Sequence, residues 1–144
     1  MATNPTLSFL RFEVIKIAFD KGEFNAERTT GDFKVKVMFR CDVNEDNKND
    51  FLSSFILSLT HKEDPSFNFQ MEAFGKFLIN GEIESGVYEN YTTISAPSIV
   101  YPYIRAFIST LFIQAGLKQF FIPPINFILF SIILPEVILP DFVP

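Results

Sequence analysis

The sequence lacks tryptophan and has a single cysteine, Cys41, and a single histidine, His61. One cysteine cannot form a disulfide within the chain, which excludes a disulfide framework and predicts a reducing, cytoplasmic location. One histidine and one cysteine cannot supply the two-histidine or histidine–cysteine set that holds a metal ion. We therefore expect no metal or cofactor, with His61 at the surface and Cys41 as a small core residue.

Charge and catalytic motifs are also scarce. Charged residues make up 20% of the chain and the net charge is −5. An acidic chain is repelled by phosphate backbones, so nucleic-acid binding is not expected. The sequence has no G-x-S-x-G elbow, no G-x-G-x-x-G turn and no phosphate-binding G-x-x-x-x-G-K loop. These absences predict a protein that is not an enzyme.

One segment resembles half of a calcium-binding loop. Asp42, Asn44 and Asp46 supply oxygen atoms at the first, third and fifth positions. The loop requires glycine at its sixth position and glutamate at its twelfth, where this chain has Asn47 and Ser53. The segment is therefore predicted to be a polar hairpin turn.

No targeting or membrane-spanning segment is expected. Residues 1–7 lack a basic stretch followed by an apolar run, so no signal peptide is predicted. Residues 120–139 are nearly all apolar, but their proline-free part, Phe127–Leu134, is much shorter than the roughly 20 residues that a helix needs to cross a bilayer. An apolar surface is the better interpretation of this segment.

Phenylalanine, by contrast, is abundant, with 19 residues in a chain that is 48% hydrophobic. A length of 144 residues corresponds to a single domain over 1–144. One small domain cannot bury this much apolar surface, so part of it is predicted to hold other protein surfaces.

Four segments are predicted to be strands of an antiparallel sheet in an α+β fold. Residues 33–43 alternate between apolar and mostly charged positions, as expected for a strand with one solvated face. Residues 7–19, 51–62 and 67–79 follow the same pattern less regularly. Within the last of these, Gly75 indicates a bulge or a close contact. In the loop at 20–25, Phe24 either folds back on the core or lines a site.

A long helix is predicted to follow a linker at residues 80–98. Ser98 is expected to cap a helix over 99–115 that ends at Gly116. The helix is apolar around most of its circumference, whereas one sheet covers only one side. A second copy of the chain is the simplest cover for the other side. The predicted interface residues are Tyr101, Tyr103, Arg105, Ile108, Ser109 and Phe112.

The second half of the chain resembles the SecB family of protein-export chaperones. That family has a P-x-I-x-[FY]-P-Y-x-R motif at the start of its long helix and a P-[VI]-N-F motif about twenty residues later. The matching residues are Pro97, Ile99, Pro102, Tyr103, Arg105, Pro124, Asn126 and Phe127. Glu72, Gly75, Phe77 and Ile79 resemble the family's last strand, and Phe24 resembles the aromatic residue in the loop after its first strand.

The resemblance implies a four-stranded antiparallel sheet with a long helix and a short or irregular second helix on one face, assembled as a homotetramer, a dimer of dimers. It also implies an activity, which is to hold unfolded polypeptides in apolar grooves without ATP. Apolar and aromatic surface suits this task because its contacts are non-directional. The candidate client-binding residues are Phe24, Phe120, Phe121, Ile122, Ile125, Phe127 and Phe130.

The chain departs from the family after Phe127. Residues 128–134 are almost wholly apolar, and Pro135 and Pro140 would stop a helix early. The family's polar tail, which helps to contact an export motor ATPase, has no counterpart here, so docking on such a motor is not favoured. The expected partners are unfolded polypeptides, either preproteins for export or another client such as an antitoxin. The alternative is a dedicated interaction subunit that binds one folded partner through this apolar segment.

Overall fold

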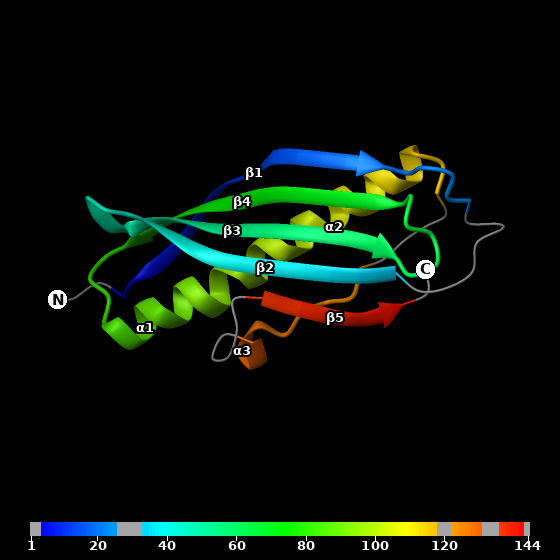
Figure 1. Cartoon of the computed structure of the whole chain (residues 1–144). Helices are drawn as coiled ribbons and strands as arrows, with labels where there is room; N and C mark the ends of the chain where they lie inside the picture. The colour runs from blue at the N-terminus through cyan, green and yellow to red at the C-terminus, as the bar shows by residue number, and fades with distance from the viewer. Residues whose placement is uncertain (1–3, 26–32, 118–121, 131–135, 143–144) are drawn as a thin grey trace.

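The computed structural model describes residues 4–25, 33–117, 122–130 and 136–142. These residues form one antiparallel sheet with strand order β1-β4-β3-β2-β5 (Figure 1). The predicted four strands are confirmed, and a fifth is added at the β2 edge. The strands are β1 (Thr6–Asp20), β2 (Phe33–Asn44), β3 (Asn47–His61), β4 (Asn68–Asn80) and β5 (Glu136–Phe142).

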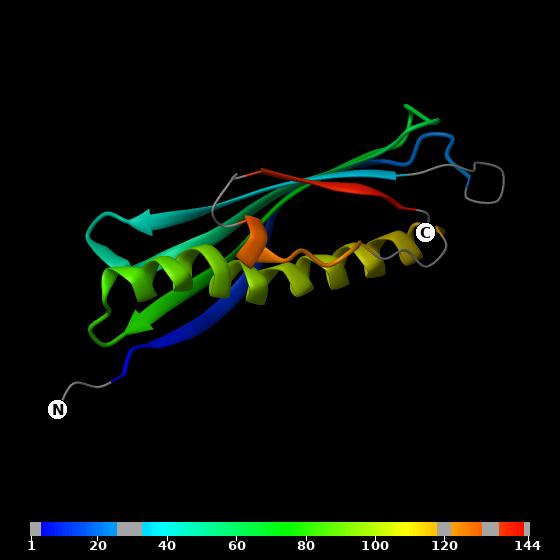
Figure 2. The same cartoon turned by 90° about the horizontal axis from the view of Figure 1, so that it is seen from below.

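One face of the sheet is covered by a long helical segment, as predicted. The segment comprises α1 (Ser85–Asn90), the π-helical turn η1 (Tyr91–Ser95) and α2 (Ala96–Gln114). A single turn, α3 (Phe127–Phe130), forms the short second helix. Figure 2 shows that both helices lie on the same side of the sheet. The architecture is therefore two layers with one core between them.

The core forms because strand alternation places the apolar residues on the helix side. In β2, Phe33, Val35 and Val37 are buried, whereas Lys34 and Lys36 are exposed. The side chains of α2 that meet this face are spaced three or four residues apart, as expected for one side of a helix. They are Val100, Tyr101, Ile104, Ile108 and Phe112, all buried.

Strand β1 is apolar on both faces because its pairing with β4 is irregular at two points. The register shifts between Phe9 and Arg11 and again between Val14 and Lys16. Each extra residue reverses the alternation of the strand. Leu10 and Ile15 occupy these positions and are 51% and 60% exposed.

Gly75 marks a close contact between the sheet and the helix, which is one of the two predicted reasons for a glycine there. A Cβ atom at this position would collide with Cγ2 of Val100 on α2 and would touch the ring of Phe77. The absence of a side chain therefore allows α2 to pack directly against β4.

The predicted linker at 80–98 and the predicted cap at Ser98 are wrong. Helical structure begins at Ser85, and the Ser98 hydroxyl donates a hydrogen bond to the Ile94 carbonyl (2.6 Å) inside the helix. The early turns are held by two tyrosines at points far apart in the chain. Tyr88 donates to the Lys48 carbonyl (2.7 Å) and Tyr91 to the Pro5 carbonyl (3.2 Å). These tertiary contacts override the polar, linker-like composition.

The predicted end of the helix is confirmed. Gly116 adopts φ +85°, a left-handed conformation that glycine reaches without steric cost. The Leu117 amide donates to the Phe112 carbonyl (3.0 Å), which satisfies the last turn. The Lys21 ammonium reaches the Ala115 carbonyl (3.3 Å), where the helix dipole favours a cation.

Within the described part of the chain, one helical segment, Ser85–Gln114, is long and apolar enough to cross a membrane by length and composition alone. Its contacts with the sheet account for part of this apolar character, because the buried residues of α2 form one wall of the core. Core helices of soluble proteins share these properties, so the segment is weak evidence for a membrane span.

Candidate functional site

The loop after β1 places Phe24 inside the core. The Asp20 carboxylate accepts a hydrogen bond from the Gly22 amide (2.8 Å), and the Phe24 amide donates to the Lys21 carbonyl (3.1 Å). This tight turn directs Phe24 back under the sheet, where its ring lies 5.1 Å from that of Phe67. Of the two predicted roles for Phe24, the structure shows folding back on the core.

His61 is buried in the same aromatic cluster, so the prediction of a surface histidine is wrong. Its ring lies 4.8 Å from Phe33 and 5.1 Å from Phe24. Its Nδ1 atom accepts hydrogen bonds from the amides of Glu63 and Asp64, both at 3.2 Å. These two contacts let the imidazole shape the turn after β3.

The segment before α3 is tied to α2 by two side chains that lie one helical turn apart. Arg105 donates from Nε to the Ile122 carbonyl (2.8 Å), and the Tyr101 hydroxyl donates to the Pro123 carbonyl (2.9 Å). Residues four apart project from the same side of a helix, which explains why Tyr101 and Arg105 act together. Burial raises the pKa of Tyr101, and the nearby Arg105 opposes this only in part, so the phenol stays a donor.

The P-I-N-F sequence performs two separate tasks. The Asn126 side chain accepts a hydrogen bond from the Ile128 amide (3.1 Å) and begins α3. Phe127 is 3% exposed, with its ring 5.0 Å from Phe39 and 5.8 Å from Tyr101. The asparagine thus orients the turn, and the phenylalanine closes the core at its β2 side.

Apolar side chains beside Phe127 reach the surface. Ile128 is 62% exposed and Ile125 is partly buried. Phe39 of β2, also partly buried, lies against Phe127. We call Phe39, Ile125, Phe127 and Ile128 the apolar rim; it joins the edge of the sheet to the segment held by α2.

The candidate client-binding residues therefore fall into three groups. Phe24, Ile122 and Phe127 are buried within the single chain, whereas Ile125 lies partly open at the rim. Phe120 and Phe121 lie outside the described residues, as does the side chain of Phe130. Their role in binding stays a prediction.

The predicted self-assembly residues also differ in exposure. Tyr101, Ile108 and Phe112 are buried against the sheet, and Arg105 and Ser109 are partly buried. Tyr103 is 48% exposed, although its ring lies 5.2 Å from that of Phe9 on β1. The apolar stripe of α2 is thus largely satisfied inside one chain, and Tyr103 is the most exposed of the predicted self-assembly residues.

Sequence reasoning missed a hollow of about 280 Å³ on the face of the sheet away from the helix. Its main apolar residues lie on the solvated side of their strands, where period-two alternation predicts polar residues. These exceptions to the alternation were the sequence signal that could have indicated the hollow. The main apolar lining residues are Ile15, Met38, Leu52, Ile56 and Phe74.

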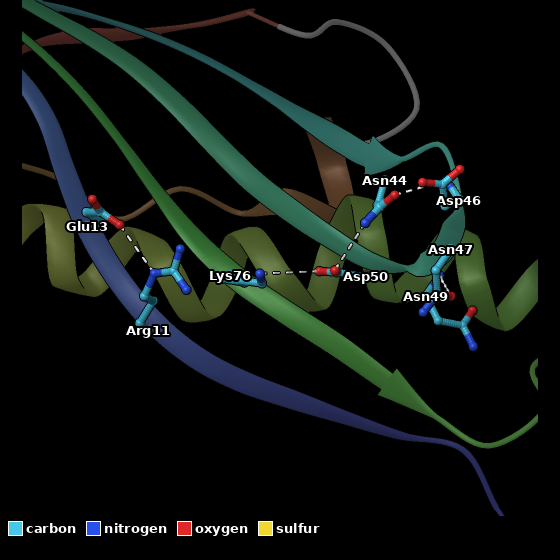
Figure 3. Close-up of polar contacts among 8 residues, drawn as sticks. All are labelled: Arg11, Glu13, Asn44, Asp46, Asn47, Asn49, Asp50 and Lys76. Carbon is cyan, nitrogen blue, oxygen red and sulfur yellow. Dashed lines mark hydrogen bonds and ion pairs between the residues drawn. The ribbon is translucent and has the colours of Figure 1, made fainter.

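The charged residues that line this hollow are Arg40, Asp42 and Glu72. Figure 3 shows two further charged pairs on the strands of the sheet. Arg11 pairs with Glu13 (3.2 Å), and Lys76 lies 3.9 Å from Asp50. Exposed pairs of this kind are typically worth less than about 1 kcal/mol, so they add polarity more than stability. No group of acidic, histidine and cysteine side chains suited to a metal ion occurs among the described residues.

The hairpin between β2 and β3 is a polar turn, as predicted from the incomplete calcium loop. The Asn44 side chain accepts a hydrogen bond from the Asp46 amide (2.9 Å), and the Asn47 side chain accepts one from the Asn49 amide (3.1 Å) (Figure 3). Asparagine side chains commonly stabilise turns in this way.

A family model described as preprotein translocase subunit SecB matches residues 10–131. The chain belongs to the SecB family. It is therefore a SecB-type chaperone, and its partners are polypeptides. A search of curated protein sequences finds no match.

Solved structures support the same fold for this SecB-family chain. It is similar to the SecB-like chaperone Rv1957 of Mycobacterium tuberculosis, which was solved in complex with a ChAD peptide from the Rv1956 HigA1 antitoxin. The TM-score is 0.65 at 12% identity, and the match covers 83% of this chain and 88% of the mycobacterial chain. At this identity the similarity concerns the fold.

Proposed function

We propose that this chain is a cytoplasmic, ATP-independent holdase that binds non-native polypeptides, either preproteins for export or an antitoxin, and that it has no catalytic activity. Family membership gives the class of function, and the complex of the mycobacterial relative makes an antitoxin a specific candidate. The apolar rim carries the proposal, because it combines exposed aliphatic surface with a backbone that α2 holds in place. The hydrogen bonds that Arg105 and Tyr101 donate to this backbone keep the apolar surface from collapsing into the core.

A non-native client offers apolar side chains in no fixed order, so the receiving surface cannot depend on directional contacts. Ile125 and Ile128 supply aliphatic surface of this kind beside the aromatic rings of Phe39 and Phe127. Phe120, Phe121 and Phe130 precede or follow the rim in sequence and are included in the proposed surface. Buried Ile122 is assigned a supporting role beneath it, whereas buried Phe24 supports the core at the other end of β2, beside Phe33.

The test is suppression of aggregation of a slowly folding client, with and without ATP. We expect suppression at stoichiometric amounts of the chaperone and no effect of ATP. In this assay, Ile128→Lys places a charge on the rim and should weaken suppression severalfold. Val43→Lys, at a position that is 43% exposed on β2 near the hairpin, is the matched control and should act like the wild type. The absence of suppression by the wild-type chain would overturn the proposal.

We also propose that the chain assembles as a homotetramer, a dimer of dimers, through the exposed side of α2. Tyr103 supports this, because a half-exposed aromatic ring beside Phe9 and Phe12 is a suitable contact for a second copy. Light scattering should give a mass of four chains, and Tyr103→Glu should lower it. A monodisperse wild-type monomer would contradict this assembly.

A further inference from the structure

The edge of β2 that faces away from β3 is filled by the chain's own strand β5. Five residue pairs connect them, beginning with Phe33 opposite Phe142 and ending with Met38 opposite Glu136. In both views β5 lies alongside β2, on the side of the molecule that also carries α3 (Figures 1 and 2). The apolar rim and the β2 edge are therefore neighbours.

The pairing between β5 and β2 is weaker than the pairing within the rest of the sheet. β2 pairs with β3 along its whole length, at twelve positions, whereas β5 has seven residues and a register irregularity between Phe33 and Val35. Pro140, which falls in this interval, has no amide hydrogen to donate to the ladder. A strand containing proline is tolerated at a sheet edge, but it forms fewer hydrogen bonds there.

The surface beneath β5 needs a partner. Without β5, the backbone N–H and C=O groups along one side of residues 33–38 would have no strand opposite them. Such an edge readily accepts another extended chain through main-chain hydrogen bonds. Val35 and Val37 on this stretch are fully buried, so the edge adjoins the core directly.

We propose that β5 is a displaceable occupant of the β2 edge, and that an extended apolar segment of a client polypeptide replaces it there. The proposal rests on the holdase function and adds a regulatory step to it, because the client must first displace residues 136–142. Among the described strands β5 pairs with β2 alone, so its departure leaves the pairs β1–β4, β4–β3 and β3–β2 in place.

The sequence of β5, EVILPDF, resembles the client segment that would replace it. It is mostly apolar and extended, as exposed stretches of a non-native chain are. A client segment without proline can donate the ladder hydrogen bond that Pro140 lacks, which favours exchange. Main-chain hydrogen bonds are independent of side-chain identity, so one edge can serve many sequences.

The experiment fixes β5 in place. Lys36 lies opposite Ile138 in the register, and directly opposed residues are close enough for a disulfide. In full-length chain carrying Cys41→Ser, the pair Lys36→Cys and Ile138→Cys is oxidised and compared with its reduced form. The matched control is Lys34→Cys with Thr60→Cys, which joins β2 to β3 at positions that are paired in both states.

The probe is a fluorescent, permanently unfolded protein whose cysteines have been reduced and alkylated before use. Because locking removes the binding-competent population, we expect oxidation of the β5 lock to weaken probe binding by at least about tenfold. Reduction should restore it, and the control disulfide should leave it unchanged. Equal binding by the locked and reduced forms would overturn the displacement of β5 while leaving the holdase function intact.

Hydrogen exchange supplies an independent readout. Saturating probe should accelerate amide exchange in residues 136–142 and leave residues 33–38 protected, since the client takes over their hydrogen bonds. Unchanged exchange in 136–142 despite tight binding counts against displacement. If no variant binds the probe at all, the holdase function itself fails. If the disulfide between Lys36→Cys and Ile138→Cys does not form on oxidation, β5 does not pair with β2 in the register on which the proposal depends.

Discussion

The two edges of the sheet are built differently. β1 pairs with β4 at thirteen positions, from Thr6 with Asn80 to Asp20 with Asn68. Its aromatic side chains also enter the core, where Phe9 stacks on Phe77 (5.2 Å) and Phe19 packs on Phe112 (5.1 Å). β5 pairs with β2 at five positions, across an irregularity.

The β1 edge is therefore an integral part of the fold, whereas the β5 edge is an addition to it. The β1 edge is part of the core, so a change there should affect the stability of the whole domain. On the opposite side, the segment from Ile122 to Phe127 is held by α2, and β5 is held by backbone pairing to β2. Changes on that side should affect local opening and client binding more than global unfolding.

The largest effect is expected from Phe112→Ala, which removes the ring that connects α2 to β1. Phe112 is fully buried and lies 5.1 Å from Phe19 and 5.2 Å from Phe69. Replacing a buried phenylalanine by alanine typically costs about 3–5 kcal/mol. Urea unfolding should show this loss, whereas Ile113→Ala, at a position that is 52% exposed, should change stability by less than about 0.5 kcal/mol. Equal effects of the two variants would contradict the central role of this contact.

Gly75→Ala should have the next largest effect, because the added methyl group meets Val100 of α2. Overpacking of this kind costs about 1–3 kcal/mol. Gly86→Ala is the control, since a Cβ atom there has nothing within 4 Å. That variant should unfold at the same or a slightly higher temperature than the wild type, because alanine favours helix more than glycine does. If Gly75→Ala proved neutral, α2 would not pack on β4 as closely as described.

Tyr101→Phe should have a smaller effect, confined to the β2 side. The variant keeps the ring against Phe127 and loses the hydrogen bond to the Pro123 carbonyl. The expected cost is about 0.5–1.5 kcal/mol. Hydrogen exchange should accelerate in residues 122–128, with Tyr103→Phe as the comparison. Faster exchange spread over the whole sheet would show that the two sides are not independent.

The smallest effect is expected from the pH dependence contributed by Cys41. Burial, with a smaller effect from Asp42, raises the pKa of this thiol from 9.0 to about 11. The folded state thus retains the proton where the unfolded state loses it, and the stability contributed by the protonated thiol declines as pH rises from 9 to 11. Urea unfolding under reducing conditions should show a shallower decline for Cys41→Ala over this range. An unchanged slope would contradict burial of the thiol.

Strand alternation and helix-end chemistry made most of the fold predictable. The β2 segment, with its lysines on one face and its valines on the other, was assigned from period-two alternation alone. Gly116 marked the end of α2. The start of the helix could not be located, because Tyr88 and Tyr91 stabilise it through distant carbonyls that local composition does not reveal.

The candidate site was less predictable, since its features depend on contacts between distant residues. P-I-N-F identified the right segment, but it could not show that Phe127 would be buried while Ile128 stayed open. Strand β5 was missed because Pro135 and Pro140 argue against a helix and say nothing about an edge strand. His61 was misplaced because its burial depends on Phe24, which is 37 positions away in the chain.

The position of β1 also has a consequence for the order in which the molecule folds. The strands β2, β3 and β4 are successive neighbours, whereas β1 must find β4 across both intervening strands. Local hairpins form before distant pairs, because closing a long loop costs more entropy. β1 is therefore synthesised first but pairs only after the β2–β3 and β3–β4 hairpins, and its core-facing Phe9, Phe12 and Phe19 remain uncovered meanwhile. Pulse labelling of amides during refolding should show protection in β3 before β1, so the newly made holdase passes through a state that resembles its own clients.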